Sequence, residues 1–295
     1  FLMPGLLGTR DSFAKRFESP VEHAEGDSAA RLQALVSPFV LRRVKEEVVA
    51  DLPEKIEDTV MAQLTGEQRK LYLANQDRIA QQVQHREAGE FKKDKLKVLA
   101  ELTKLRQICC DPHLHYADYK AGSAKLDTCM ELVHGALDGG HRILLFSQFT
   151  GMLDIIGKRL VKEDIAFLKL TGASSKESRA KMVAQFQAGE VPVFLISLKA
   201  GGVGLNLTAA DVVIHYDPWW NVAAQDQATD RAHRIGQQHT VTVYKLIAKD
   251  TIEERIMQMQ ESKRDLVNSV LGGDGISSAL FTREDVLALL GGDGR

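Results

Sequence analysis

Short apolar runs alternate with longer amphipathic segments from residue 124 to residue 271, and this alternation constrains the fold more than any other feature. The amphipathic segments have the spacing of helices that bury one face. The apolar runs are rich in β-branched residues and have the length of buried strands: RILLFSQ, IAFLKL, VFLIS, DVVIHY and TVTVYKLI. Strands that are apolar along their whole length and alternate with helices predict a parallel sheet covered on both faces. We therefore expect an α/β fold.

The residues before 124 have a different pattern. The segment from Leu64 to Cys110 is predicted to be largely helical, with Thr65 as an N-cap. A mixed charge run between residues 90 and 106 is typical of a solvated helix face. We expect four parts: a lead-in over 1–35, a mostly helical linker and protrusion over 36–123, a lobe over 124–271 and a tail over 272–295.

Composition excludes several classes of protein. The net charge of −2 means that contact with nucleic acid requires a local patch, a helix N-terminus or backbone amides. No apolar run is long enough to span a bilayer, and no secretory signal pattern is present. The three cysteines form neither a disulfide framework nor a CxxC zinc site, which favours a reducing, cytosolic compartment, and we expect no metal site. Because the first residue is Phe, we expect the chain to be part of a longer protein.

Polar residues follow the predicted strands at the points where the strands end. They are Ser147-Gln148, Thr171-Gly172, Ser197 to Lys199 and Asp217 to Trp220. In open parallel sheets, ligands bind at the carboxyl ends of the strands, which meet at one edge. Each of these residues alone is more often a loop cap, but together they predict a ligand-binding rim.

The stretch from Val193 to Gln237 carries the most specific chemistry. Its AGGVGLN segment has glycines that let backbone amides approach a ligand closely. A helix is predicted from Val222 to Ile235, with Gly236 as its C-cap. On such a helix Arg231 and Arg234 share a face, and Gln227 lies one turn earlier. Two guanidiniums and an amide suit a polyphosphate, and the alternative is a solvated helix with an Asp230–Arg234 pair.

This stretch resembles the second motor lobe of the Swi/Snf family of helicase-like, DNA-translocating ATPases. SLKAGGVGLNL is similar to the fifth motif of that family, and QATDRAHRIGQ is similar to its sixth. SPFVLRRVKEEVVADLPEK resembles the connector between the two lobes. The resemblance implies a RecA-like C-terminal lobe, preceded by a linker and protrusion. By the same resemblance, the charged helix of residues 90–106 would be a protrusion near DNA, which is the alternative to a solvated helix face. It places the protein in the cytosol, on the nucleoid of a bacterium or in the nucleus of a eukaryote.

The resemblance also implies residue roles. Arg231 and Arg234 would be arginine fingers that reach the γ-phosphate, with Gln227 positioning phosphate or water, and Gly204 and Asn206 would lie near the nucleotide. Residues implied to hold a DNA phosphate backbone are Ser147, Gln148, Thr171, Gly172, Ser197, Lys199 and Trp220. Val222 stands where the family usually has proline, which alters the expected loop after Trp220.

Two motifs expected of a complete ATPase are absent. The sequence contains neither GxxxxGK[ST] nor a DEAH-like acidic box, which would cradle phosphates and hold magnesium. We expect the cofactor to be ATP with Mg²⁺ held by a preceding first lobe, and the lobe alone to be inactive. The expected partners are that first lobe, double-stranded DNA and a protein substrate on the DNA, with no membrane and a monomeric state. The alternative is a RecA-like module that docks on DNA or protein without catalysis.

Overall fold

The computed structural model describes residues 5, 7–18, 28–39, 52–85, 88–200, 204–217, 222–259 and 283–291. The chain divides into two compact units, Phe1–Asp51 with Lys263–Gly273, and Leu52–Ser262 with Asp274–Arg295. The described part of the first unit contains short helical segments: α1 (Arg10–Phe13), a π-helical turn (Ala14–Glu18), α3 (Ser28–Val36) and a 3-10 turn (Ser37–Phe39). The second unit, here called the main unit, contains every described candidate residue.

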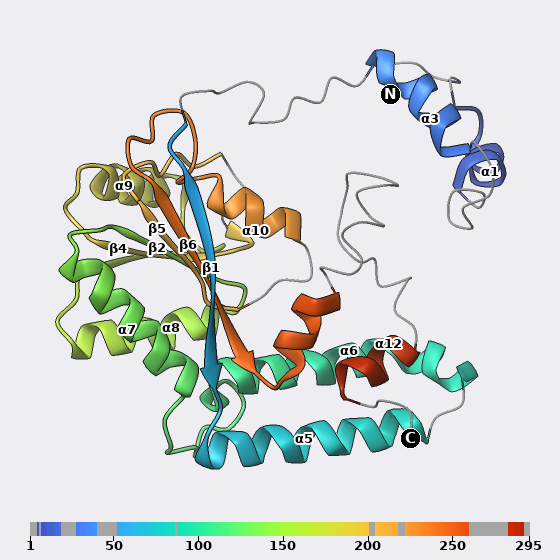
Figure 1. Cartoon of the computed structure of the whole chain (residues 1–295), viewed down its shortest axis with the longest axis horizontal. Coiled ribbons are helices and arrows are strands. Elements are labelled where there is room, and N and C mark those ends of the chain that lie inside the picture. Colours follow the sequence, from blue (N-terminus) through green and yellow to red (C-terminus); the bar gives the residue numbers. More distant parts are fainter. Residues whose placement is uncertain are drawn as a thin grey trace. The chain divides into compact units, whose positions relative to one another are not determined.

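A six-stranded, wholly parallel sheet forms the centre of the main unit, which confirms the predicted α/β fold (Figure 1). The strand order is β1-β6-β5-β2-β4-β3. The strands are β1 (Lys55–Gln63), β2 (Ile143–Ser147), β3 (Phe167–Leu170), β4 (Val193–Ser197), β5 (Val212–His215) and β6 (Val241–Lys249). Parallel strands require long crossover connections, and the amphipathic segments provide them.

Both faces of the sheet are buried. In β4, Val193 and Leu195 belong to one apolar cluster, while Phe194 and Ile196 belong to another. The first cluster includes side chains of the helices α7 (Ala124–Asp138) and α8 (Thr150–Lys162), and the second includes side chains of α9 (Lys176–Gln187) and α10 (Val222–Thr229). This alternation explains why the central strands are apolar at every position.

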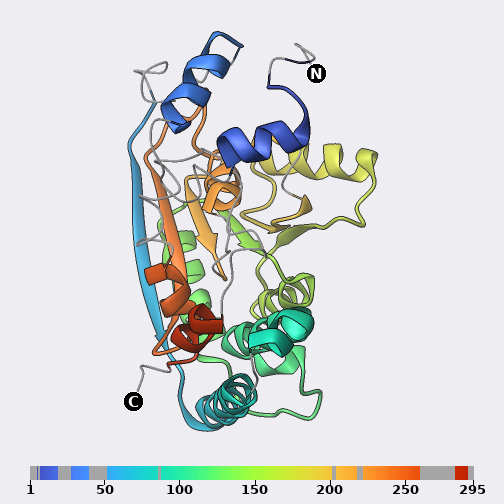
Figure 2. The same cartoon turned by 90° about the vertical axis from the view of Figure 1, so that its right-hand side faces the viewer.

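A third apolar cluster joins the long helices to the end of the chain. It contains side chains of α5 (Gly66–Gln84), α6 (Ala88–Cys110), the helical residues 252–259 and α12 (Arg283–Leu289). Figure 1 and Figure 2 both show α5 and α6 side by side near α12. The side chain of Gln68 joins α5 to α6 and to the start of α7, because its Nε2 donates to the carbonyl of Ile108 at 2.9 Å and its Oε1 accepts from the amide of Ala124 at 3.1 Å.

The strand β1 was not predicted, and it differs from the other strands. It pairs with β6 residue by residue, from Lys55 with Val241 to Gln63 with Lys249. Figure 2 shows the two long strands side by side. Only Ala62 of its side chains is buried, because β1 lies at the edge of the sheet. The compact main unit begins at Leu52, so it includes β1 and the long helices as well as the strands from β2 onward.

Candidate functional site

The helix carrying the candidate arginines is shorter than predicted. α10 ends at Thr229, and residues 230–237, here called the arginine loop, continue as tight turns. Ala232 N donates to Thr229 O at 3.0 Å, and Gln237 N donates to Arg234 O at 3.0 Å. Gly236 has a φ of +101°, a value that favours glycine. The prediction of a helix to Ile235 with Gly236 as its C-cap was therefore wrong, and Gly236 lies in a turn instead.

Arg231 is a desolvated cation. Arg231 is 5% exposed, and its Nε has no hydrogen-bond partner among the described residues. Burial lowers the pKa of this guanidinium, the positive charge of Arg234 lowers it further, and Asp230 opposes the change. The backbone carbonyl of Arg231 accepts a hydrogen bond from the amide of Leu207 at 3.0 Å, which fixes the residue to the preceding segment. An incoming anion would restore the interactions that this side chain lost on burial.

Arg234 lies close to Arg231 but is exposed. Its Nη1 reaches the carbonyl of Leu205 at 3.5 Å. Gln227 is exposed in the last turn of α10. The two arginines are thus neighbours because of the turns after the helix, rather than because they share a helical face.

The segment 204–211 supports the arginine loop from one side. Its residues alternate in exposure: Gly204 and Asn206 are exposed, whereas Leu205 and Leu207 are buried. Gly204 has a φ of +24°. The predicted nucleotide residues Gly204 and Asn206 are therefore accessible, next to the carbonyl that Arg234 contacts. Residues 201–203 of the glycine run lie outside the described residues.

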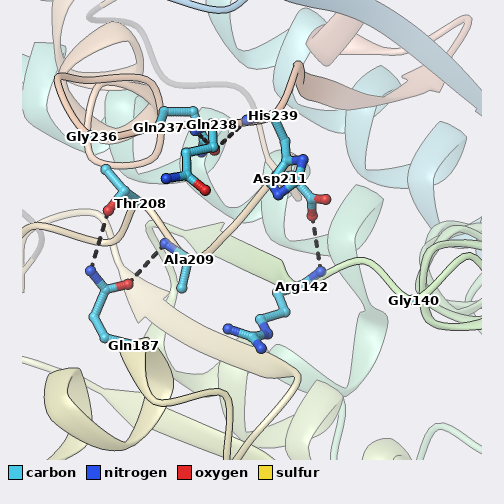
Figure 3. Close-up of a pocket in the computed structure, with 10 residues that line it drawn as sticks. All are labelled: Gly140, Arg142, Gln187, Thr208, Ala209, Asp211, Gly236, Gln237, Gln238 and His239. Atoms are coloured by element: carbon cyan, nitrogen blue, oxygen red, sulfur yellow. Dashed lines mark hydrogen bonds between the residues drawn. The ribbon is translucent and has the colours of Figure 1, made fainter.

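A polar cavity of about 370 Å³ lies between the end of the arginine loop, at Gly236 and Gln237, and the end of the segment 204–211 (Figure 3). Arg142, Asp211 and His239 line it just before β2, β5 and β6 begin, so the cavity is at the amino ends of these strands. Gln237 lines the cavity and holds the arginine loop beside it, because its Nε2 donates to Ala210 O at 2.7 Å and to Ala232 O at 3.1 Å. The sequence pattern predicted ligand binding at the carboxyl ends of the strands, and no sequence motif indicated a cavity at their amino ends.

The carboxyl ends of β2, β4 and β3 are adjacent in the sheet, so the predicted rim residues lie along one edge. Two of them are buried. The Ser147 hydroxyl donates to Asp217 Oδ1 at 2.5 Å, and Ser197 is 2% exposed. Asp217 also accepts from the amide of Gln148 at 3.2 Å, and burial raises the pKa of its carboxyl against the effect of the Arg106 charge. Ser147 therefore helps to fix the start of the following loop.

Other rim residues reach the surface. Lys199 and Gly172 are exposed, and Thr171 and Gln148 are partly exposed. The Gln148 side chain accepts a hydrogen bond from Arg106 Nη1 at 3.3 Å, so a residue of α6 helps to orient it. This contribution of Arg106 was not predicted, because nothing in its local sequence distinguishes it from the solvated charges around it. Trp220 lies outside the described residues.

A buried ion pair was also missed. Lys125 Nζ lies 2.5 Å from Glu253 Oε2, and both side chains are fully buried. Glu253 also accepts from the amide of Ala248 at 2.9 Å, and the ammonium of Lys125 lies 5.4 Å from the centre of the Tyr216 ring. This pair connects α7 with the residues after β6.

Two types of site are absent from the described part of the chain. None of its helices has the length and apolar character needed to cross a membrane. No cluster of His, Cys, Asp or Glu side chains there is arranged to hold a metal ion.

The parallel sheet, its polar carboxyl edge and the paired arginines define a RecA-like lobe of a helicase-like ATPase. Comparison with known families agrees, because residues 124–236 match the Helicase conserved C-terminal domain and residues 1–114 match the SNF2-related domain. Among solved structures, the Sulfolobus solfataricus SWI2/SNF2 ATPase C-terminal domain is 32% identical, with a TM-score of 0.66 over 80% of this chain and 98% of that chain. The chain belongs to the SWI2/SNF2 (Swi/Snf) family.

Other similar proteins are longer than this chain. The structure of the Sulfolobus solfataricus SWI2/SNF2 ATPase core in complex with dsDNA is 36% identical, with a TM-score of 0.68 over 97% of this chain and 61% of that chain. An uncharacterized ATP-dependent helicase of Mycoplasma pneumoniae is 38% identical, and the putative ATP-dependent helicase/translocase YwqA of Bacillus subtilis is 39% identical. The chain aligns over 98% and 96% of its own length with these two relatives but spans 27% and 32% of theirs.

Proposed function

We propose that this chain provides the second motor lobe of an ATP-driven translocase on duplex DNA, in which Arg231 and Arg234 contact the γ-phosphate of a nucleotide held between two lobes. The single observation that carries the proposal is the desolvated Arg231 guanidinium, whose Nε has no partner among the described residues, beside Arg234. Burying a cation without a partner costs free energy, so the buried Arg231 guanidinium is consistent with an anion that binds to it during function. Bound phosphate would supply that partner.

The residues around the arginines fit a nucleotide but not its metal. Gln227, Gly204 and Asn206 are exposed, and Gly204 and Asn206 flank the residue whose carbonyl Arg234 contacts. Their amides and accessible backbone suit phosphate oxygens. Because no carboxylate cluster among the described residues is arranged for a cation, we assign Mg²⁺ to the first lobe. Bound ATP with Mg²⁺ would supply the transferable phosphoryl group. Arg231 and Arg234 would donate hydrogen bonds to its oxygens as negative charge develops, and Gln227 would orient phosphate or water.

The DNA contacts are assigned to the carboxyl edge of the sheet. Lys199, Gln148, Thr171 and Gly172 would hold one phosphate backbone, Trp220 would lie against the DNA, and the buried Ser147 and Ser197 would fix the strand ends that present them. Contacts of this kind do not read bases. Closure of the two lobes on ATP, followed by opening after product release, would then move the protein along one strand. A protein bound to the DNA would be the object that is remodelled.

The test uses the full-length protein. We expect Arg231→Ala and Arg234→Ala each to reduce DNA-stimulated ATP turnover by ~10³-fold or more, the range known for arginine fingers. DNA affinity should stay within about twofold, since neither side chain lies at the carboxyl edge. Arg69→Ala, which alters an exposed arginine of α5, is the matched control and should behave as wild type.

Unchanged turnover in both arginine variants would contradict the finger assignment. If the wild-type protein binds DNA but hydrolyses no ATP in its presence, the chain is instead a docking module. Titration of turnover against duplex DNA distinguishes this outcome from a catalytic protein with weak DNA affinity.

A further inference from the structure

We infer that His233 is a positioning residue, which ties the arginine loop to the point where the chain enters the main unit. His233 Nε2 lies 2.7 Å from the backbone carbonyl oxygen of Pro53, a residue 180 positions earlier in the sequence. Because a carbonyl oxygen can only accept, the imidazole N–H is the donor. The inference rests on the proposed function, since it concerns the placement of Arg231 and Arg234.

His233 lies between the two arginines in a compact stretch of backbone. Its own amide donates to Thr229 O at 3.1 Å, and the amide of Arg234 donates to Ala232 O at 3.2 Å. The Thr229 side chain is fixed in turn by the buried His215, at 2.9 Å. Each arginine is within two residues of the imidazole, so a shift of that ring moves the backbone that carries both guanidiniums.

The acceptor belongs to a rigid entry segment. The carbonyl of Glu54 accepts from the amide of Val241 at 3.0 Å, and from Lys55 onward the chain is paired with β6. Pro53 has a ring-locked φ and no backbone N–H, so its carbonyl is its sole hydrogen-bonding group. The hydrogen bond therefore joins the arginine loop to a backbone segment with little freedom.

The segment that His233 contacts lies where the chain passes from the first unit into the main unit. Residues 1–51 belong to the separate compact unit, and the main unit starts at Leu52. The first unit also includes residues 263–273, so the chain passes between the two units at three points, and residues 52–54 are the main-unit side of one of them. A displacement of the first unit that pulls on the chain at this point acts directly on residues 52–54. Through Pro53 and His233, such a displacement would change how Arg231 and Arg234 are presented. The inferred role is thus to couple the connector to the arginines.

A kinetic comparison in the full-length protein tests this role. His233→Ala should reduce DNA-stimulated kcat by about 10- to 100-fold, the scale expected when reacting groups are misplaced by about an ångström. KM for ATP should change by less than about twofold, because a bond that acts through position affects the transition state more than ground-state binding. His233→Gln retains an N–H donor of similar reach and should recover most of the kcat. His239→Ala, at an exposed histidine that lines the cavity, is the control.

Amide hydrogen exchange provides a readout independent of catalysis. In His233→Ala, exchange should accelerate in both 230–237 and 52–54, while the central strands and the melting temperature stay unchanged. A kcat equal to that of wild type would overturn the inference, as would a failure of His233→Gln to recover activity. Arg231→Ala measured alongside separates the two proposals: if it is impaired and His233→Ala is normal, the coupling is wrong and the finger assignment stands. If Arg231→Ala is itself normal, the proposed function fails.

Discussion

At the residue scale, the arginine loop depends on Gly236. Its φ of +101° is disfavoured for residues with a Cβ, although an added Cβ would meet no atom within 4 Å. We expect Gly236→Ala to lower the free energy of unfolding by about 1–3 kcal/mol through backbone strain alone. Chemical denaturation measures this change.

Gly135→Ala is the matched control for Gly236→Ala. Gly135 lies in the interior of α7, has no positive φ and has open space at its Cβ. Alanine should therefore stabilise this helix by up to about 1 kcal/mol. Equal effects of the two substitutions would show that the conformation of Gly236 is not under strain.

His215 should make stability depend on pH. Burial, followed by the charge of Lys245, lowers its pKa to about 3, while Glu57 opposes the shift. Since the unfolded chain has the higher pKa, it binds a proton first as the pH falls below about 6.5. The free energy of unfolding should then decrease by up to about 1.4 kcal/mol per pH unit between pH 6.5 and 3, and remain unaffected by this group above pH 6.5.

Comparison with His215→Gln isolates this contribution. Glutamine does not titrate and can still reach Thr229, the partner of His215 at 2.9 Å. The difference in unfolding free energy between wild type and His215→Gln should vary with pH below 6.5 and be constant above it. Parallel curves over the whole range would contradict the assignment of a neutral, buried imidazole.

The residue types of the candidate site could be predicted from the sequence, but their geometry could not. Arg231 and Arg234 were identified from their motif, whereas the end of α10 at Thr229 was not predicted, nor was the hydrogen bond of the Thr229 hydroxyl with His215, fourteen positions earlier. A helical pattern contains no information on such tertiary contacts. Ser147 likewise follows a strand as expected, yet its burial depends on Asp217, from another strand end.

At the scale of elements, the central strands and their helices were predictable and β1 was not. Among the five recognised strands, β2, β4 and β5 are buried at every position and are almost wholly apolar, whereas β3 and β6 are partly exposed but keep long apolar runs. KIEDTVMAQ is at the edge, is exposed along most of its length and carries charges that pair across strands, such as Glu57 with Lys245. Edge strands often carry such charges, and local pattern alone does not separate them from loops.

The buried pair between α7 and the residues after β6 should be important for stability. Removing one partner leaves an uncompensated buried charge, so Lys125→Met or Glu253→Gln should each cost about 3–5 kcal/mol of unfolding free energy. The double variant should cost less than the sum of the two, because neither charge remains. A double-mutant cycle by chemical denaturation measures the coupling, and single variants within 1 kcal/mol of wild type would contradict it.

At the scale of the whole molecule, the proposed DNA binding requires a local surface, since the net charge of the chain is −2. In the full-length protein, Lys199→Ala should weaken binding equally to duplexes of unrelated sequence and reduce the slope of log K against log salt by about 1. Lys162→Ala, at an exposed lysine at the end of α8, is the control and should leave the slope unchanged. An effect that varies with DNA sequence would argue for base contacts instead of phosphate contacts.

The order of the strands also has a consequence for biosynthesis. β1 is made first in the main unit, yet its partner β6 begins at Val241, after every other strand. Loops of this length must close before such pairing gains any free energy, which slows folding. A nascent lobe that has left the ribosome as far as β5 therefore leaves unpaired the edges of β1 and β5 that β6 covers in the finished sheet, until the last strand emerges and joins the first.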